Sequence, residues 1–139
     1  MNDFLTNLPG YNLRRASTAV QTQLTDALSH LSLRPADFSM LITIKNEPRV
    51  TPSELGKQLG IQRANMVNMV TRLEERGAVS RIALDGRSYG LELTQTGIDL
   101  CAQAQEIVET LESDLLMRVP PEHRDHLLPA LHALWMNQN

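Results

Sequence analysis

Three side chains able to read base edges occur at helical spacing in the middle of the sequence. At about 100° per residue, Asn68 lies roughly 300° and Arg72 roughly 340° around a helix from Asn65, so the three share one face. Amide and guanidinium groups make bidentate hydrogen bonds to adenine and guanine in the DNA major groove. The spacing therefore indicates a surface that reads DNA sequence.

The same stretch carries an apolar stripe on its opposite side. Met66, Val70 and Leu73 lie roughly 80–140° around the helix from the first asparagine, and Gly77 then ends it. We expect a helix over residues 62–76 that buries this stripe and exposes the polar face. An ordinary surface helix with incidental asparagines is the alternative, although such a helix more often carries Glu and Lys.

The elements before this helix complete a helix-turn-helix. A helix over residues 35–46 precedes a short helix over 53–60, which ends at Gly60 just before the polar helix. The second helix of such a pair enters the major groove. Together with the hairpin that follows, residues 35–94 are predicted to form the DNA-binding part.

The hairpin supplies a wing. The strands are expected at 79–84 and 90–93, joined by the turn signal Asp85-Gly86. Arg87 at the tip is placed to enter a minor groove, and Arg81 at the base to bind phosphate. The predicted fold class is mainly α with a small β-wing, a winged helix-turn-helix flanked by N- and C-terminal dimerisation helices.

The distribution of charge agrees with a polyanionic partner. The 139-residue chain has a net charge of −3, but residues 45–90 carry eight basic and five acidic groups, whereas residues 91–139 carry two and eight. Double-stranded DNA would be attracted to the middle third and repelled by the tail. Thr51 and Ser53 are further candidate phosphate donors, together with the free N–H groups of the helix that they begin.

The outer segments, residues 9–31 and 95–136, are predicted to form dimerisation helices. They belong to a single domain that spans residues 1–139. One of them has apolar residues at steps of three and four: Cys101, Ala104, Val108, Leu111 and Leu115. Such a seam needs a partner surface, and a second copy of the chain is the simplest one. Packing against the chain's own first helix is the alternative, and both are compatible.

Other classes of protein have little support. No catalytic motif is present, so the chain is expected not to be an enzyme and to need no cofactor. His123 and His126 lack further ligands, so no metal is expected. The chain has neither a membrane span nor a signal peptide, which indicates a cytoplasmic protein. A winged helix that binds protein rather than DNA is the rival, but it would expose apolar anchors.

Cys101 raises the question of redox sensing. A sensing thiol needs exposure and nearby positive charge, whereas the neighbours of Cys101 in sequence are apolar. A packed thiol is the favoured interpretation, and a thiol-based redox regulator is the alternative.

An ordered set of segments resembles the MarR family of bacterial transcriptional regulators. The matching pieces are Gly10-Tyr11-x-Leu13-Arg14-Arg15-Ala16, the stretch from Leu59 to Gly77, Val79-x-Arg81, Asp85-x-Arg87 and Leu93-Thr94-x-x-Gly97. The resemblance extends over roughly residues 10–135. It implies a homodimer that represses at a palindromic operator and is released by a small molecule, often a phenolic or aromatic acid, or by oxidation.

The resemblance also implies site residues. The DNA-facing positions are Ala64, Asn65, Asn68, Arg72 and the wing residue Arg87, with Arg63 beside them. The candidate effector-lining residues are Tyr11, Arg15, His30 and Ser39. The chain departs from the family pattern at Gln62, a poor N-cap, at Ala64 and Thr71, where Ser and Asp are frequent, and in a wing about two residues shorter than usual.

Overall fold

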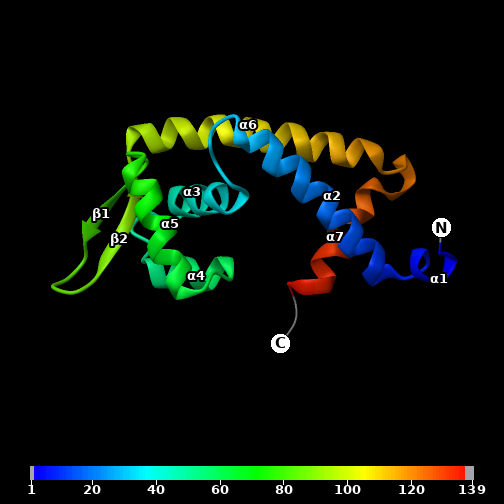
Figure 1. Ribbon diagram of the computed structural model, residues 1–139, viewed down its shortest axis with the longest axis horizontal. Helices are drawn as coiled ribbons and strands as arrows, with labels where there is room; N and C mark the ends of the chain where they lie inside the picture. The colour runs from blue at the N-terminus through cyan, green and yellow to red at the C-terminus, as the bar shows by residue number, and fades with distance from the viewer. Residues whose placement is uncertain (1, 137–139) are drawn as a thin grey trace. The chain divides into compact units, whose positions relative to one another are not determined.

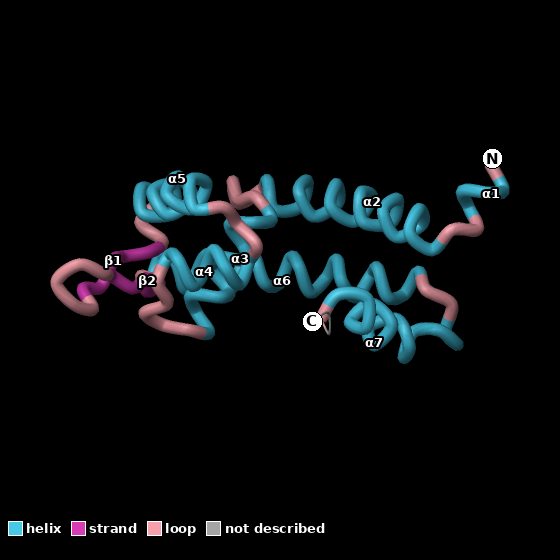
Figure 2. The backbone as a smooth tube through the Cα atoms, turned by 90° about the horizontal axis from the view of Figure 1, so that it is seen from below, coloured by secondary structure: helices cyan, strands magenta, loops and turns pink. Residues whose placement is uncertain are grey.

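The computed structural model describes residues 2–136, which fold into two compact units that divide between residues 107 and 108. The first unit contains a cluster of three helices and a hairpin, seen together in Figures 1 and 2. These elements are α3 (Pro35–Asn46), α4 (Pro52–Leu59), α5 (Arg63–Glu75), β1 (Val79–Ala83) and β2 (Tyr89–Leu93). Their shared core includes the buried side chains of Met40, Leu41, Ile44, Leu55, Met66, Val70, Leu73 and Leu91.

Local capping sets the ends of the two helices that form the turn. The Thr51 hydroxyl accepts the Glu54 N–H at 3.1 Å, and the Glu54 carboxylate accepts the Thr51 N–H at 3.2 Å, a reciprocal box that begins α4. Gly60 ends α4 with a φ of 67°, where only glycine is unstrained. Gln62 caps α5 without a side-chain hydrogen bond, as its poor capping propensity predicted.

The wing is a two-stranded antiparallel sheet in which Val79 pairs with Leu93 and Ala83 with Tyr89. Val50 adds a single bridge to Leu91, which ties the segment before α4 to the wing. Gly90 lies against the Arg49 carbonyl, where a Cβ atom would overlap it. Glycine at this position therefore allows the close approach of the two backbones.

Two longer helices complete the first unit. Figures 1 and 2 show α2 (Pro9–Ser29) leaving the cluster, with the short α1 (Asp3–Thr6), which the sequence did not predict, at its far end. Leu28 is the single buried residue of α2. The helix α6 (Gln95–Arg118) begins at Thr94, whose hydroxyl accepts the Gly97 N–H at 3.0 Å. Its early seam residues Cys101 and Ala104 are fully buried within the chain.

The second unit contains the end of α6, the 3₁₀ turn η1 (Pro121–His123) and α7 (Arg124–Trp135). The Arg124 guanidinium donates to the carbonyls of Leu116, Met117 and Val119, at 3.2, 3.0 and 2.9 Å respectively, and so caps the end of α6. Pro129 stands inside α7 without ending it. Over residues 2–136, no helix combines the length and apolar character needed to cross a bilayer.

The predicted fold class is confirmed: the described chain is mainly helical with a small β-wing. Predicted helix and strand limits agree with the observed ones to within a few residues, because glycines, prolines and capping residues mark most of the boundaries.

Candidate nucleic-acid interface

The N-terminal half of α5 presents the polar face that its periodicity predicted. Asn65 and Asn68 are exposed, as are Arg63 and Ala64 beside them. The opposite stripe, represented by Met66, is 3% exposed or less and faces the core. The two amides therefore project from the fold with no backbone or side-chain partner in the described part of the chain.

Arg72 does not share this freedom, because a carboxylate of another helix pairs with its guanidinium, and contact of Arg72 with DNA stays a prediction. Its Nη2 atom lies 2.7 Å from Oδ1 of Asp37, and its side chain is 35% exposed while that of Asp37 is 7% exposed. The other oxygen of Asp37 accepts the Arg34 N–H at 2.9 Å and begins α3. The periodicity gave the direction of Arg72 correctly, but the buried carboxylate turns its guanidinium toward α3.

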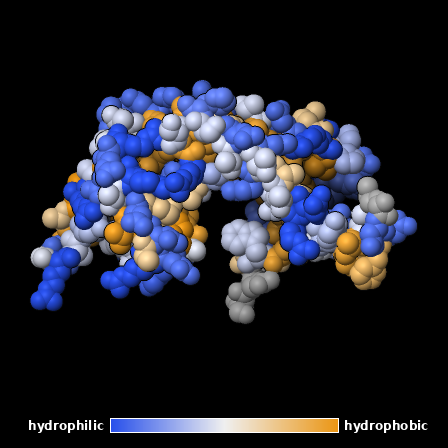
Figure 3. All heavy atoms as spheres, in the orientation of Figure 1, coloured by the Kyte–Doolittle hydropathy of each residue, from blue (hydrophilic) through white to orange (hydrophobic). Residues whose placement is uncertain are grey.

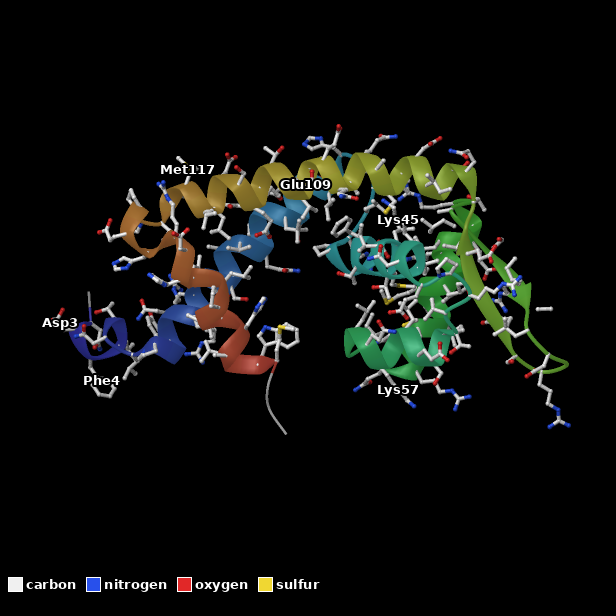
Figure 4. All side chains as sticks on the ribbon, turned by 180° about the vertical axis from the view of Figure 1, so that it is seen from behind. Asp3, Phe4, Lys45, Lys57, Glu109 and Met117 are labelled. Atoms are coloured by element: carbon white, nitrogen blue, oxygen red, sulfur yellow. The ribbon has the colours of Figure 1, made fainter. Side chains whose placement is uncertain are left out.

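A groove of about 790 Å³ lies beside this polar face, between α4, the start of α5 and the wing. Its rim carries three cationic side chains, from Lys57, Arg63 and Arg87. The ion pairs found among residues 2–136 involve other groups, so no described carboxylate neutralises these three. Figure 3 shows hydrophilic surface at the wing tip and along the outer edge of α4, and Figure 4 shows Lys57 on that edge. Lys57 was not among the predicted contacts.

The wing tip is ordered by Asp85. Its Oδ1 atom accepts the N–H groups of Arg87 and Ser88 at 3.0 and 2.9 Å, and the same backbone hydrogen bonds lower the pKa of the Asp85 carboxyl. The backbone of Arg87 is thus fixed while its guanidinium stays exposed. At the other side of the groove, Thr51 is half-buried in its capping box and Ser53 is exposed on the first turn of α4.

Arg81, predicted to bind phosphate, is instead engaged within the fold. Its Nε and Nη2 atoms donate to the Glu74 carboxylate at 3.0 and 2.8 Å, and its guanidinium stacks over the Tyr89 ring at 4.5 Å. The hydrogen bond to Glu74 raises the pKa of Arg81 above its ordinary value. This arrangement joins α5 to both wing strands, while the Arg81 side chain stays 46% exposed, so a contact of Arg81 with phosphate stays a prediction.

A further arginine holds α5 from its C-terminal end. Arg76 donates from Nη1 to the carbonyl of Ser32 at 2.7 Å and from Nη2 to that of Leu31 at 2.8 Å. Ser32 has a φ of 53°, so this loop between α2 and α3 is held in an unfavourable conformation by its contacts. Neither Arg76 nor Asp37 stood out in the sequence, because their partners lie 35 or more residues away.

Cys101 is completely buried, and burial raises the pKa of its thiol, although the charge of Lys45 acts in the opposite direction. The larger effect is burial, so the environment of Cys101 opposes formation of the reactive thiolate. Over the same residues, no three His, Cys, Asp or Glu side chains gather as metal ligands would.

The four predicted effector-lining residues lie at the two ends of α2 and on α3. Tyr11 and Arg15 lie one turn apart near the start of α2, where Arg14 rather than Arg15 stacks on the Tyr11 ring at 5.9 Å. His30 lies at the other end of α2, about 28 Å of helix axis away, and Ser39 lies on α3. One small ligand cannot touch Tyr11 and His30 of the same protomer.

Comparison with known proteins identifies the family. The family model described as MarR family matches residues 33–89. The structure is similar to the transcriptional repressor CouR bound to a 23-mer DNA duplex, with 34% identity, a TM-score of 0.88 and 95% of each chain covered. It is also similar to CouR bound to p-coumaroyl-CoA, with 31% identity, a TM-score of 0.85 and 99% of each chain covered.

A third similar structure is that of the Mycobacterium tuberculosis MarR family protein Rv2887 in complex with salicylic acid. It is 27% identical, with a TM-score of 0.74 over 91% of this chain and 96% of that one. The family model, the identity over nearly the whole chain and the winged fold agree. The chain belongs to the MarR family.

Proposed function

We propose that this protein is a sequence-specific DNA-binding transcriptional repressor. The observation that carries the proposal is the pair of exposed amides of Asn65 and Asn68 on α5, next to a groove rimmed by unpaired cations. Amides provide base-edge contacts, while the cations provide affinity for phosphate that does not depend on sequence. A regulator needs both kinds of contact at one surface.

Each side chain has a role in this proposal. Asn68, near the centre of the outward face, hydrogen-bonds an adenine edge, and Asn65 supports it from the adjoining position. Lys57 and Arg63 bind phosphates on either side of the groove, joined by Ser53 and the free N–H groups at the start of α4. Arg87 enters the neighbouring minor groove from the wing tip. Thr51 donates its hydroxyl proton to phosphate while its oxygen caps α4.

The repressor acts as a homodimer. Large apolar side chains are exposed in the second unit, among them Met117, Leu128 and Trp135, at 63, 60 and 68%. A second copy of the chain is the simplest cover for such surface, and twofold pairing places two recognition helices about 34–36 Å apart. The operator is therefore a palindrome whose half-sites are one helical turn apart.

The effector is a small aromatic carboxylic acid or its thioester. The similar structures named above hold p-coumaroyl-CoA and salicylic acid, which share a phenol ring and a carboxylic acid group, free in one and a thioester in the other. Such a ligand releases DNA only if it binds the DNA-incompetent conformation more tightly, with a coupling of about 1–3 kcal/mol. Because Tyr11 and His30 are far apart, Tyr11 with Arg15 and His30 with Ser39 form two alternative parts of its site.

A protein-binding winged helix is the rival function. Its recognition face would carry aromatic or large apolar anchors. The exposed part of α5 instead carries two asparagines and an arginine, with Val67 as its one large apolar side chain. This composition favours a DNA-binding function over a protein-binding one.

Selection of bound duplexes from a random pool tests the proposal. We expect enrichment of a palindrome, lost in an Asn65→Ala/Asn68→Ala double variant that keeps its dimeric mass and its helical circular dichroism. Repeating the binding measurement with a panel of aromatic acids and their CoA thioesters tests the effector class. A pool without enrichment, or a monomer in solution, would contradict the proposal.

A further inference from the structure

Val67 is an exposed apolar side chain on α5, roughly 200° around the helix from Asn65 and so between the buried stripe and the polar face. Within residues 35–94, all of which the structure describes, only Val67 and Leu84 are large hydrophobic residues with exposed side chains, at 63 and 41%. Val67 lies about 100° around the helix from Met66, outside the buried stripe. Because it buries little surface, it contributes little to the stability of the protomer.

The surroundings of Val67 belong to the DNA-facing surface. Its side chain lines the same groove as Arg63, Lys57 and Arg87. Thr71, one turn further along α5, donates its hydroxyl to the Val67 carbonyl at 2.9 Å, so that proton is already used. On the row formed by Arg63, Val67 and Thr71, one turn apart from each other, the position between Arg63 and Thr71 therefore offers carbon rather than a hydrogen-bond donor.

The DNA major groove has one feature that such a group recognises. Thymine carries a methyl group at C5, and apolar side chains contact it there. A β-branched residue has one strongly preferred χ1 rotamer in a helix, so the isopropyl group of Val67 is already held in place and loses little entropy on contact.

We infer that Val67 is a specificity-determining residue that packs on the C5 methyl group of a thymine in each operator half-site. The inference rests on the proposed function and adds a base to the recognised sequence that neither asparagine reads. Loss of one buried methyl contact weakens binding about fourfold, and loss in both half-sites about sixteenfold.

The test pairs a change in the protein with a change in the DNA. In the duplex selected from the random pool, each thymine of both half-sites is replaced in turn by deoxyuridine, which keeps the base pair and lacks the methyl group. Wild type, Val67→Ala and the matched control Leu84→Ala are compared by their dissociation constants. We expect wild type and Leu84→Ala to lose about sixteenfold at one symmetric thymine position.

For Val67→Ala, we expect a similar loss on the unmodified duplex and no further loss when that thymine is replaced. Because Val67 is exposed, the variant should melt at the temperature of wild type. Equal sensitivity of wild type and Val67→Ala to every replacement, or no sensitivity in wild type, would overturn the inference and leave the repressor proposal standing. Failure of wild type to select any sequence would overturn both.

Discussion

The two halves of α5 use their polar side chains in opposite ways. In the N-terminal half, Asn65 and Asn68 are exposed and make no side-chain hydrogen bond within the described chain. In the C-terminal half, Arg72, Glu74 and the C-cap residue Arg76 each bond to another part of the first unit. The C-terminal end of α5, the held end, is bonded to the rest of the fold. The N-terminal end, the free end, is available to a partner.

The held end explains how the free end is positioned. Arg72 ties α5 to the start of α3, Glu74 ties it to the wing, and Arg76 ties it to the loop after α2. These contacts in three directions fix the rotation and tilt of the helix. A binding surface needs such support, because a displacement of about 1 Å is enough to misalign base contacts.

The largest effect should come from breaking the held end at Arg72. Arg72→Ala leaves the Asp37 carboxylate buried without its cation, and we expect the free energy of unfolding to fall by about 2–3 kcal/mol, less than for a fully buried pair because Arg72 is partly exposed. Urea denaturation measures the change. The matched control is Arg63→Ala at the free end, expected within about 0.5 kcal/mol of wild type. Equal stability of the two variants would remove the distinction between the halves.

Asn68→Ala should give the next largest effect, and on DNA rather than on stability. Loss of a bidentate contact is expected to weaken binding to the selected duplex by about 1–3 kcal/mol, or roughly 5–150-fold. Fluorescence anisotropy against the selected duplex and a scrambled one separates specific from non-specific loss. An equal loss on both duplexes would show that Asn68 contributes general affinity and does not read a base.

The direction in which side chains point was predictable from sequence, whereas their partners were not. The 3.6-residue period placed Asn65 and Asn68 outward and Met66 inward, because facing depends only on local helix geometry. The partner of Arg72 is 35 residues away, and no local rule pairs it with a carboxylate that also begins another helix. The sequence therefore does not distinguish arginines that pair within the fold from arginines that stay unpaired.

The same limit applies to the cations of the groove. Arg81 and Arg87 both lie on the wing, and both were predicted to contact DNA. Arg81 is paired with Glu74, whereas no carboxylate of the described residues pairs with Arg87. Lys57 was missed, although its position one turn after Ser53 on α4 was a usable signal. The predicted effector-lining residues stay a prediction, since the length of α2 separates Tyr11 from His30 only within one protomer.

A comparison of Arg87 with Arg81 extends the contrast to the wing. For Arg87→Ala we expect the slope of log K against log salt to fall by about 0.9, the value for one neutralised phosphate. For Arg81→Ala we expect a slope close to that of wild type, because Glu74 already holds that charge. Titrations at several salt concentrations measure both slopes. Reversed results would mean that DNA displaces Glu74 and that the short wing does not reach phosphate.

The smallest effect is expected at Cys101, a buried group outside both halves of α5. Since burial raises the pKa of its thiol, the thiolate fraction at neutral pH lies below that of an ordinary cysteine, and its growth is displaced to higher pH. Iodoacetamide should therefore modify the folded protein slowly at pH 7.5 and the urea-unfolded protein at the rate of a free thiol. DNA binding by Cys101→Ser should respond to peroxide as wild type does. Rapid labelling of the folded chain together with a lost peroxide response would instead make Cys101 the sensor and connect oxidation to the free end of α5.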